Sequence, residues 1–278
     1  MGPRLDSGMG TPDPAAPEVV AEGLCKSFDM RAVLVDIHML VERGQMVAVV
    51  GGSGSGKTVL LHLLAGLMPP TRGRVRVADH SRPGAPLIDL AGLGEDAIDA
   101  VRRHWAVVFQ QNALFSGSVY ENIALLLREH GERDERRILA RARTALASVA
   151  LDVDDVLLKD RDNLSGGMAK RVAIARAIAI DPALVFYDEP TTGLDPVVGA
   201  HIHELIWTTH LATTSAGVPR TSILVTHDKE LLRRVRPHVV MLHAGRVCFS
   251  GTYNEFEGVP DGPPREYLRA MPILHARQ

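Results

Sequence analysis

The chain has 278 residues, of which 46% are hydrophobic and 23% charged, and its formal net charge at pH 7 is −2. This balance is typical of globular domains and excludes a disordered or fibrous protein. There is no large basic excess for binding nucleic acid, and no apolar run approaches the roughly 18–20 residues that cross a bilayer.

The first residues, 1–17, are rich in Gly, Pro and small polar side chains and lack the apolar stretch of a secretory signal. We expect them to form a disordered tail. The two cysteines, Cys25 and Cys248, lie too far apart for a C-x-x-C motif. We expect both to be small buried residues in a reducing compartment. These features favour a soluble, cytoplasmic protein.

The first strong structural pattern is the segment Met46–Val50, which is apolar at every position and predicts a strand covered on both faces. It runs into GGSGSGKT and then into a helical segment, VLLHLLAGL. The octapeptide matches the phosphate-binding pattern G-x-x-x-x-G-K-[ST], in which the glycines let successive N–H groups surround phosphates. A Gly-rich turn without a ligand is the alternative, and the flanking strand and helix disfavour it. We expect nucleotide phosphates to contact Gly51, Gly52, Ser53, Gly54, Ser55, Gly56, Lys57 and Thr58.

Residues 112–180 are rich in Ala, Leu, Arg and Glu at helical spacing, which predicts a helical subdomain inserted in the sheet. Near its end, NLSGGMAKRVAIARAIAI contains a second candidate anion site, made of Ser165, Gly166 and Gly167 at the start of a helix. An ordinary Ser N-cap is the alternative. The helix has a predicted buried stripe, with Lys170 and Arg171 outside it; the stripe is formed by Met168, Val172, Ala175 and Ala179.

Two further apolar strands are predicted at Ala183–Tyr187 and Ser222–Thr226. The first leads into Asp188 and Glu189, and the second leads into His227. Ligands of open α/β sheets bind at the carboxyl ends of the strands, so these side chains are expected beside the phosphate-binding loop. There, Asp188 is suited to hold Mg²⁺ through water and Glu189 to polarise an attacking water. Such a carboxylate pair is commonly a solvated surface feature, but these two follow an apolar strand.

The remainder of the chain predicts less. HVVMLHAGRVCFSG reads as two short strands about a turn at Ala244-Gly245. The segment GVPDGPPREYLRAMPILHARQ, with four prolines and no clear period, forms a C-terminal extension over 259–278. There is one phosphate-binding loop and no internal repeat.

Four segments in this order, LSGG at Leu164–Gly167, RAIA from Arg176, LVFYDEPTTGLDP and VTHD, resemble the nucleotide-binding subunit of ATP-binding-cassette (ABC) transporters. The resemblance runs from about residue 18 over nearly all of the remaining chain. It implies an α/β P-loop ATPase with a predominantly parallel sheet, an N-terminal antiparallel β part and an inserted α-helical subdomain. The ATPase domain would span 18–258, with the helical subdomain at about 112–180, and the ligands would be ATP and Mg²⁺.

The resemblance also implies roles for single residues. Two copies dimerise head to tail in this family, so that Ser165, Gly166 and Gly167 of one copy close on the γ-phosphate held by the other.

Further roles carry over by position in the sequence. Phe28 would stack on adenine, with a core Phe as the alternative. Gln110, which Gln111 follows, would contact Mg²⁺ and the attacking water. Asp195 would communicate across the dimer, and His227 would contact the γ-phosphate. The catalytic set is therefore Glu189, His227 and Gln110, and the metal set is Thr58, Gln110 and, through water, Asp188.

Met168, where most cassettes have Gln, points to a narrower group, together with ALFSGSVYENIALLLREH and FEGVPDGP. These segments resemble the ATPases of Mce-type phospholipid transporters, which include the maintenance-of-lipid-asymmetry (Mla) system. Leu126 in place of Pro, and the general form TTGLDP, depart from that group's pattern. The resemblance implies a permease, a second ATPase copy, an Mce-domain subunit, a small accessory subunit and no nucleic acid. The chain would lie on the cytoplasmic face of an inner membrane and move phospholipids between inner and outer membranes.

Three alternatives remain in view. An importer ATPase for another small solute is the first. The second is a soluble cassette ATPase of DNA repair, chromosome structure or ribosome function, which would need a coiled-coil arm or two cassettes. Only about 130 residues separate Lys57 from Asp188, which leaves no room for such an arm. A P-loop kinase or GTPase, the third, does not account for residues 163–168.

Overall fold

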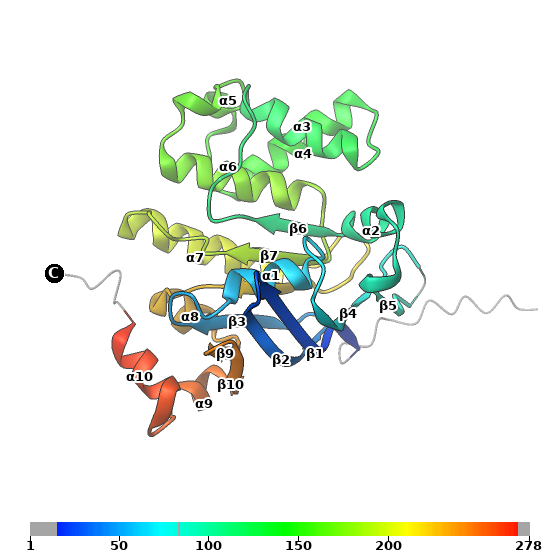
Figure 1. Ribbon diagram of the computed structural model, residues 1–278. Coiled ribbons are helices and arrows are strands. Elements are labelled where there is room, and N and C mark those ends of the chain that lie inside the picture. Colours follow the sequence, from blue (N-terminus) through cyan, green and yellow to red (C-terminus); the bar gives the residue numbers. More distant parts are fainter. Residues whose placement is uncertain (1–15, 83, 272–278) are drawn as a thin grey trace, which may run out of the picture.

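The computed structural model of the chain describes residues 16–82 and 84–271 (Figure 1). Most of the predicted N-terminal tail therefore lies outside the described residues. The end of that prediction is wrong, because the first strand, β1, already begins at Pro17. Val19, Ala21 and Leu24 of this strand are buried in the core.

A six-stranded sheet in the order β10-β9-β3-β8-β7-β6 forms the centre of the molecule. Its strands are β3 (Met46–Gly51), β6 (Trp105–Val108), β7 (Leu184–Asp188), β8 (Thr221–Val225), β9 (His238–His243) and β10 (Arg246–Thr252). All pairs are parallel except β9 with β10, which form the hairpin expected about Ala244-Gly245. Every residue of β3, β7 and β8 is buried, as their unbroken apolar sequences predict.

The second sheet is antiparallel and four-stranded, in the order β2-β1-β4-β5. It contains β1 (Pro17–Phe28), β2 (Arg31–Glu42), β4 (Arg72–Ala78) and β5 (Leu87–Asp89). The helix α1 (Lys57–Leu64) contacts strands of both sheets. Its four leucines at positions 60, 61, 63 and 64 are buried in the apolar core that the two sheets share. This packing fixes the direction in which the N-terminus of α1 points.

The helical subdomain stands on the other face of the central sheet, above β6 in Figure 1. It consists of α3 (Val119–Glu129), α4 (Glu135–Ser148), α5 (Val153–Val156) and α6 (Gly166–Ala179). The helix α6 contacts α3, α4 and the strand β6, so it connects this subdomain to the sheet. Ser165 caps the start of α6, since its Oγ accepts from the Met168 N–H at 3.3 Å.

The remaining helices pack against the strands of the sheet, against other helices, or against both. They are α2 (Glu95–Arg102), α7 (Pro196–Leu211), α8 (Lys229–Val235), α9 (Tyr253–Glu257) and α10 (Gly262–Ala270), and short 3₁₀ turns lie at Leu90–Gly92 and Arg161–Asn163. Phe256 of α9 and Leu268 of α10 are buried in the same core as α7 and α8, so the first part of the C-terminal extension packs on the domain. None of the described helices is both long and apolar enough to cross a membrane.

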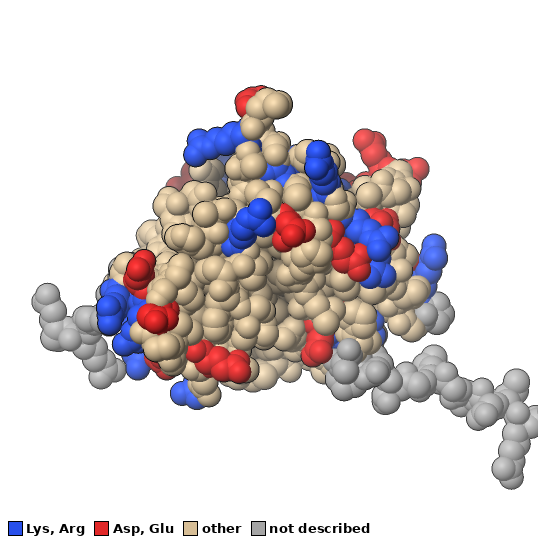
Figure 2. All heavy atoms as spheres, turned by 60° about the horizontal axis from the view of Figure 1, so that its bottom comes forward, with Lys and Arg blue, Asp and Glu red and all other residues tan. Residues whose placement is uncertain are grey.

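The cysteines differ from the expectation. Both are free, Cys25 is half-buried, and Cys248 is exposed on β10, so the prediction that both are buried is wrong. The strand β10 lies at the edge of the sheet, and its side chains alternate between exposed and half-buried. On the face of the molecule shown in Figure 2, basic and acidic side chains are interspersed around areas without charge.

Candidate functional site

The strand order brings the predicted site residues to one edge of the central sheet. Strands β3, β8, β7 and β6 are parallel neighbours, so their carboxyl ends lie together. Gly51 ends β3, Asp188 ends β7, and the loops after β8 and β6 carry His227 and Gln110. The Glu189 N–H donates to Val225 O at 2.9 Å, which joins the ends of β7 and β8 directly.

The loop between β3 and α1 is tightly curled. Gly51, Gly54 and Gly56 have φ angles of +148°, +72° and +97°, which glycine adopts far more readily than other residues. A Cβ at Gly51 would lie 2.3 Å from Leu242 O, whereas a Cβ at Gly52 or Gly54 would meet no atom within 4 Å. The loop is therefore packed against the sheet at its start and open along its middle.

The start of α1 lacks a side-chain cap. Gly56 is its N-cap residue, so no side chain accepts from the first-turn N–H groups there. Such N–H groups, with the positive end of the helix dipole, bind phosphate. The Ser55 hydroxyl in the same loop is buried and has no hydrogen-bond partner among residues 16–82 and 84–271. This loop thus fits a polyphosphate.

Lys57 lies over this loop. Its Nζ donates to Gly51 O at 2.9 Å and to Gly52 O at 3.1 Å. Burial lowers the pKa of Lys57, and the negative charges of Glu189 and Asp188 oppose that shift. An ammonium that donates to backbone carbonyls can exchange them for a phosphate, whose negative charge offsets the cost of burial.

Thr58 and Asp188 form a pair of hard oxygen ligands. The Thr58 hydroxyl donates to Asp188 Oδ1 at 3.2 Å, although the two residues are 130 positions apart. Asp188 is 4% exposed, and burial raises the pKa of its carboxyl, which the hydrogen bond from Thr58 partly counteracts. Hydroxyl and carboxylate oxygens suit Mg²⁺, so the pair fits the predicted metal. Gln110 and Gln111 are both exposed at the end of β6, so exposure does not discriminate between them.

Glu189 and His227 also meet. Glu189 Oε2 lies 2.7 Å from His227 Nδ1, and the Glu189 carboxyl side chain is 12% exposed. Glu189 has φ +45°, a conformation that is uncommon outside glycine and is found where structure imposes it. The side chain is thus held at a fixed place at the end of β7, with a neighbouring group that can accept or donate a proton.

A buried cluster next to His227 was not predicted from the sequence. Asp228 is fully buried, and its Oδ2 accepts from Thr191 Oγ1 at 2.8 Å and lies 2.7 Å from His203 Nε2. Burial raises the pKa of Asp228, but the hydrogen bond and charge of His203 outweigh it and the pKa falls to about 2. Asp228 also caps α8. It therefore connects the loop after Glu189 to the loop that carries His227. The signal in the sequence that could have indicated this role is an Asp, a common N-cap residue, directly before KELLRRV.

Phe28 lies at the tip of the β1–β2 hairpin. Its side chain is 44% exposed, which excludes the alternative of a core phenylalanine. The Lys26 ammonium lies 5.0 Å from the ring centroid. Strand β2 reaches the phosphate-binding loop, because a Cβ at Gly56 would lie 2.7 Å from Leu34 Cδ2. The hairpin is thus attached to the loop, and an exposed ring at its end is free to stack on a base.

The second candidate anion site lies at the start of α6, apart from the first. A Cβ at Gly166 would meet nothing within 4 Å, whereas one at Gly167 would lie 2.8 Å from Val198 Cγ1 on α7. Asp195 caps α7 by accepting from the N–H groups of Val197 and Val198 at 3.0 and 3.1 Å. No hydrogen bond or ion pair within the described residues joins Ser165–Gly167 to the loop Gly51–Thr58.

The sequence analysis placed Lys170 and Arg171 outside the buried stripe of α6, and for Lys170 the outcome differs. Lys170 is 2% exposed, and its Nζ donates to Phe109 O at 3.1 Å and to Gln110 O at 2.8 Å. Periodicity assigns a lysine to the solvent face because it takes no account of carbonyl groups from other segments. Arg171 donates to Ala150 O at 3.0 Å. Met168 is partly buried and packs on the core.

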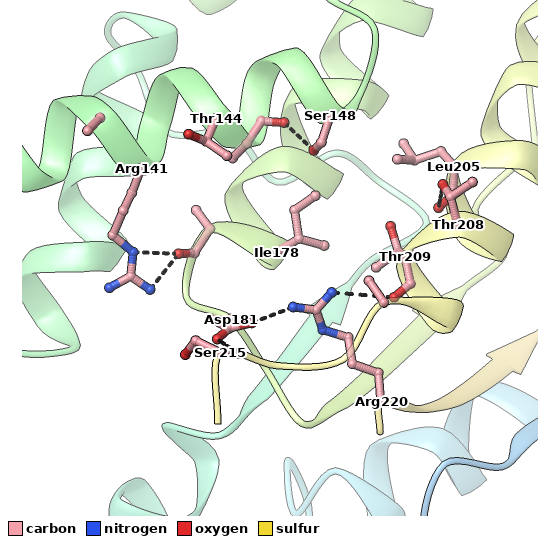
Figure 3. A pocket seen from close by; sticks show the side chains of 14 residues that line it. Arg141, Thr144, Ser148, Ile178, Asp181, Leu205, Thr208, Thr209, Ser215 and Arg220 are labelled. Carbon is pink, nitrogen blue, oxygen red and sulfur yellow. Dashed lines mark hydrogen bonds and ion pairs between the residues drawn. The ribbon is translucent and has the colours of Figure 1, made fainter. Parts of the chain in front are cut away.

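A groove of about 840 Å³ lies away from this edge, between α4, the end of α6 and α7 (Figure 3). Its arginines serve the fold: Arg141 donates to Ala179 O at 2.9 Å, and Arg220 pairs with Asp181 and donates to Pro182 O at 3.0 Å. Asp181 and Arg220 precede β7 and β8, so the groove lies at the amino edge of the sheet, opposite the phosphate-binding loop.

Comparison with known proteins gives consistent matches. Residues 34–192 match the family model described as ABC transporter. The chain is 32% identical over 243 residues to Protein TRIGALACTOSYLDIACYLGLYCEROL 3, chloroplastic, of Arabidopsis thaliana, covering 83% of this chain and 67% of that protein. It is 38% identical over 239 residues to the methionine import ATP-binding protein MetN of Latilactobacillus sakei subsp. sakei (strain 23K), covering 86% of this chain and 64% of that one. The chain thus spans about two thirds of the length of these relatives.

Among solved structures, the chain is similar to the ATP-binding cassette MJ0796 in a dimeric, post-hydrolysis state bound to ADP and Pi. The TM-score is 0.73 and the sequence identity 28%, over 84% of this chain and 98% of that one. The likeness agrees with the predicted fold class.

Proposed function

Because the chain belongs to the ABC transporter family of ATPase domains, we propose that it is the ATP-hydrolysing subunit of a membrane transporter that acts as a pair of copies. One observation carries the proposal. A phosphate loop, a candidate metal pair and a carboxylate–histidine pair meet at one sheet edge, while the second anion device of the same chain lies elsewhere.

Different side chains of this chain would bind the phosphates, hold the metal and orient the attacking water during ATP hydrolysis. Lys57 and the amides of its loop are placed to hold the β- and γ-phosphates, and Thr58, Gln110 and, through water, Asp188 would hold Mg²⁺. When bound, the metal would neutralise charge that develops on the phosphates. Glu189 orients the attacking water and accepts its proton, because its carboxylate is fixed at the strand end and points to the same edge. His227 donates to a γ-phosphate oxygen.

The second anion device is assigned to the partner's nucleotide. Ser165 caps α6 through the Met168 N–H, and Gly166 and Gly167 begin the helix without a Cβ that would shield their N–H groups. Asp195 caps α7, whose Val198 lies against Gly167. A symmetric pair of copies places the same patch of each chain against the other. The dimeric state described for MJ0796 with ADP and Pi supports this arrangement.

A substitution in the signature segment, which is Ser165–Gly167, tests the arrangement. Replacing Ser165 with Arg introduces a long cation at an exposed helix start without touching the loop Gly51–Thr58. We expect ATP hydrolysis to stop while the isolated chain binds a fluorescent ATP analogue with unchanged affinity. Equal loss of binding and hydrolysis would refute the assignment to the partner's site.

A second surface fits a membrane partner. A groove of about 380 Å³ next to the Gln110 loop is lined mainly by apolar side chains, including Leu67, Trp105, Phe109, Phe115 and Leu125. Phe115 and Leu125 are 57% and 41% exposed. Exposed large apolar side chains gathered at a groove mark interaction sites. We assign this groove to a cytoplasmic segment of the permease, which would thereby be connected to the residue that contacts Mg²⁺.

For the cargo, phospholipid moved by an Mce-type (Mla-like) system is our proposal. It rests on Met168, on the segment 113–130 and on the relative from Arabidopsis thaliana, whose name is that of a galactolipid. The same proposal includes an Mce-domain subunit, a small accessory subunit and a location on the cytoplasmic face of the inner membrane. The second candidate is import of a small solute, which the match to a methionine import protein favours.

Isolation of the intact complex from its native membrane separates the two candidates. A Glu189→Gln variant, used to slow turnover, should co-purify with a permease and an Mce-domain protein, and extraction should recover phospholipid above the level found with an unrelated membrane complex. A complex that instead contains a soluble solute-binding protein, and whose ATPase is stimulated by an amino acid and not by phospholipid, would contradict the lipid assignment.

A further inference from the structure

The loop between β6 and α3 is attached to the helical subdomain by cationic side chains. Lys170 of α6 donates to the carbonyls of Phe109 and Gln110, at 3.1 and 2.8 Å. Further along the loop, Arg176 donates to Ala113 O at 3.0 Å. Side chains of α6 therefore hold the loop by its backbone carbonyls, so this attachment does not depend on the side chains of the loop.

Another contact extends this attachment. Arg161, just before α6, donates to Leu114 O at 2.6 Å. The guanidinium of Arg176 also lies 5.3 Å from the Phe115 ring centroid, so the same arginine borders the apolar groove assigned to the permease. From residue 109 to residue 115, the loop is therefore attached to the helical subdomain, and we expect the two to move together.

Lys170 is the member of this set that is closest to the chemistry. It is 2% exposed, and among the described residues no carboxylate lies within ion-pair distance of its Nζ. Burial therefore lowers the pKa of Lys170 to about 8, a shift that the charge of Asp188 opposes, and the buried ammonium depends on its hydrogen bonds. Here both bonds go to the backbone of Gln110 and its neighbour. Five residues earlier on the same helix is Ser165, which begins the signature segment.

We propose that Lys170 is a positioning residue that fastens the Gln110 loop to the signature helix, so that movement of Ser165–Gly167 onto the partner's nucleotide also moves Gln110 at the chain's own magnesium site. This rests on the proposed dimeric ATPase function. The Lys170 side chain then connects Ser165–Gly167, which act on the partner's nucleotide, with Gln110, which acts on the chain's own nucleotide. Lys170 acts through Gln110 and touches neither nucleotide.

The test is a double-mutant cycle between Lys170→Met and Gln110→Ala. Met keeps the length and apolar stem of the lysine but cannot donate. We expect Lys170→Met to lower kcat about tenfold or more, since a small misplacement of a catalytic group has effects of this size, with little change in the KM for ATP. In the Gln110→Ala background, Lys170→Met should lower kcat no further, because the residue through which it acts is already removed. Lys170→Arg should restore most of the activity.

A second readout does not depend on turnover. Hydrogen exchange of the peptide 109–117 should be faster in Lys170→Met than in the parent, in the absence of nucleotide. The control Lys159→Met removes a partly exposed lysine of the same subdomain that pairs with Asp155, and it should change neither readout. If Lys170→Met does not fold, Lys170→Gln replaces it in both measurements.

Different results would refute the role of Lys170 and the proposed ATPase function. Additive effects of Lys170→Met and Gln110→Ala, or unchanged exchange of 109–117, would refute the role of Lys170 while leaving the ATPase intact. If the parent chain does not hydrolyse ATP, or Gln110→Ala is without effect on hydrolysis, the proposed function fails instead.

Discussion

Replacement of Gly166 by Ala should lower ATPase activity without lowering the stability of the fold. A Cβ at Gly166 would meet no atom within 4 Å, and Gly166 is the first residue of α6. Ala in a helix is favoured over Gly, so the variant should be as stable as the parent or more stable by about 0.5 kcal/mol. Its melting temperature should rise by at most about 1–2 °C.

In the dimer the same methyl group would occupy the space that a phosphate of the partner's ATP needs. We expect steady-state ATPase activity to fall at least about a hundredfold, the range seen when one donor to a developing charge is lost. Binding of a fluorescent ATP analogue to the isolated chain should not change.

The neighbouring glycine provides a matched control. At Gly167 a Cβ would lie 2.8 Å from Val198 Cγ1, so Gly167→Ala should destabilise the chain by about 1–2 kcal/mol through overpacking. Adding Val198→Ala should restore stability without restoring hydrolysis. A Gly166→Ala chain that hydrolyses ATP at the parent's rate, or that melts several degrees lower, would refute the reasoning.

Three further predictions follow from single side chains. Glu189→Gln should keep ATP binding, lose at least about a hundredfold in kcat and elute as a dimer with ATP in size-exclusion chromatography; normal turnover would remove Glu189 from its role. Phe28→Ala should weaken ATP binding about tenfold, the size of a lost stacking contact on a base, without lowering the melting temperature, since the ring is 44% exposed; unchanged binding would exclude stacking. Burial lowers the pKa of His210 from 6.5 to about 4, so the unfolded chain binds the proton more readily and the free energy of unfolding should fall as the pH decreases from about 6.5 to about 4. His210→Asn should flatten urea-unfolding midpoints over that range, and an unchanged slope would show that His210 does not titrate as described.

The parts of the site that were predicted from the sequence share a physical origin. The segments Met46–Val50, Ala183–Tyr187 and Ser222–Thr226 are apolar without interruption, and β3, β7 and β8 lie within one residue of these bounds. A fully buried strand leaves polar groups available mainly at its ends, so the position of Asp188 and Glu189 at the end of β7 could be predicted from the sequence.

The parts that were missed depend on contacts between distant segments. Lys170 is buried because the carbonyls of Phe109 and Gln110 receive its ammonium, which no pattern within α6 records. The stretch that forms α10 contains Pro263 and Pro264, which hid its helical character, yet they occupy its first turn, where proline is tolerated. Cys248 is exposed because β10 is an edge strand, which the order of strands along the sequence does not reveal.

The most direct test that two copies form each ATP site is the ATPase activity of a mixture of two inactive variants. Lys57→Ala removes the phosphate-loop ammonium but keeps the signature, whereas Ser165→Arg blocks the signature but keeps the phosphate loop. Neither variant alone should hydrolyse ATP. An equal mixture should recover about a quarter of the parent's activity. Half of the randomly formed pairs are mixed, and in each mixed pair one of the two sites has both an intact phosphate loop and an intact signature segment. A mixture that forms mixed pairs, shown by tagged co-purification, and yet stays inactive would contradict the account.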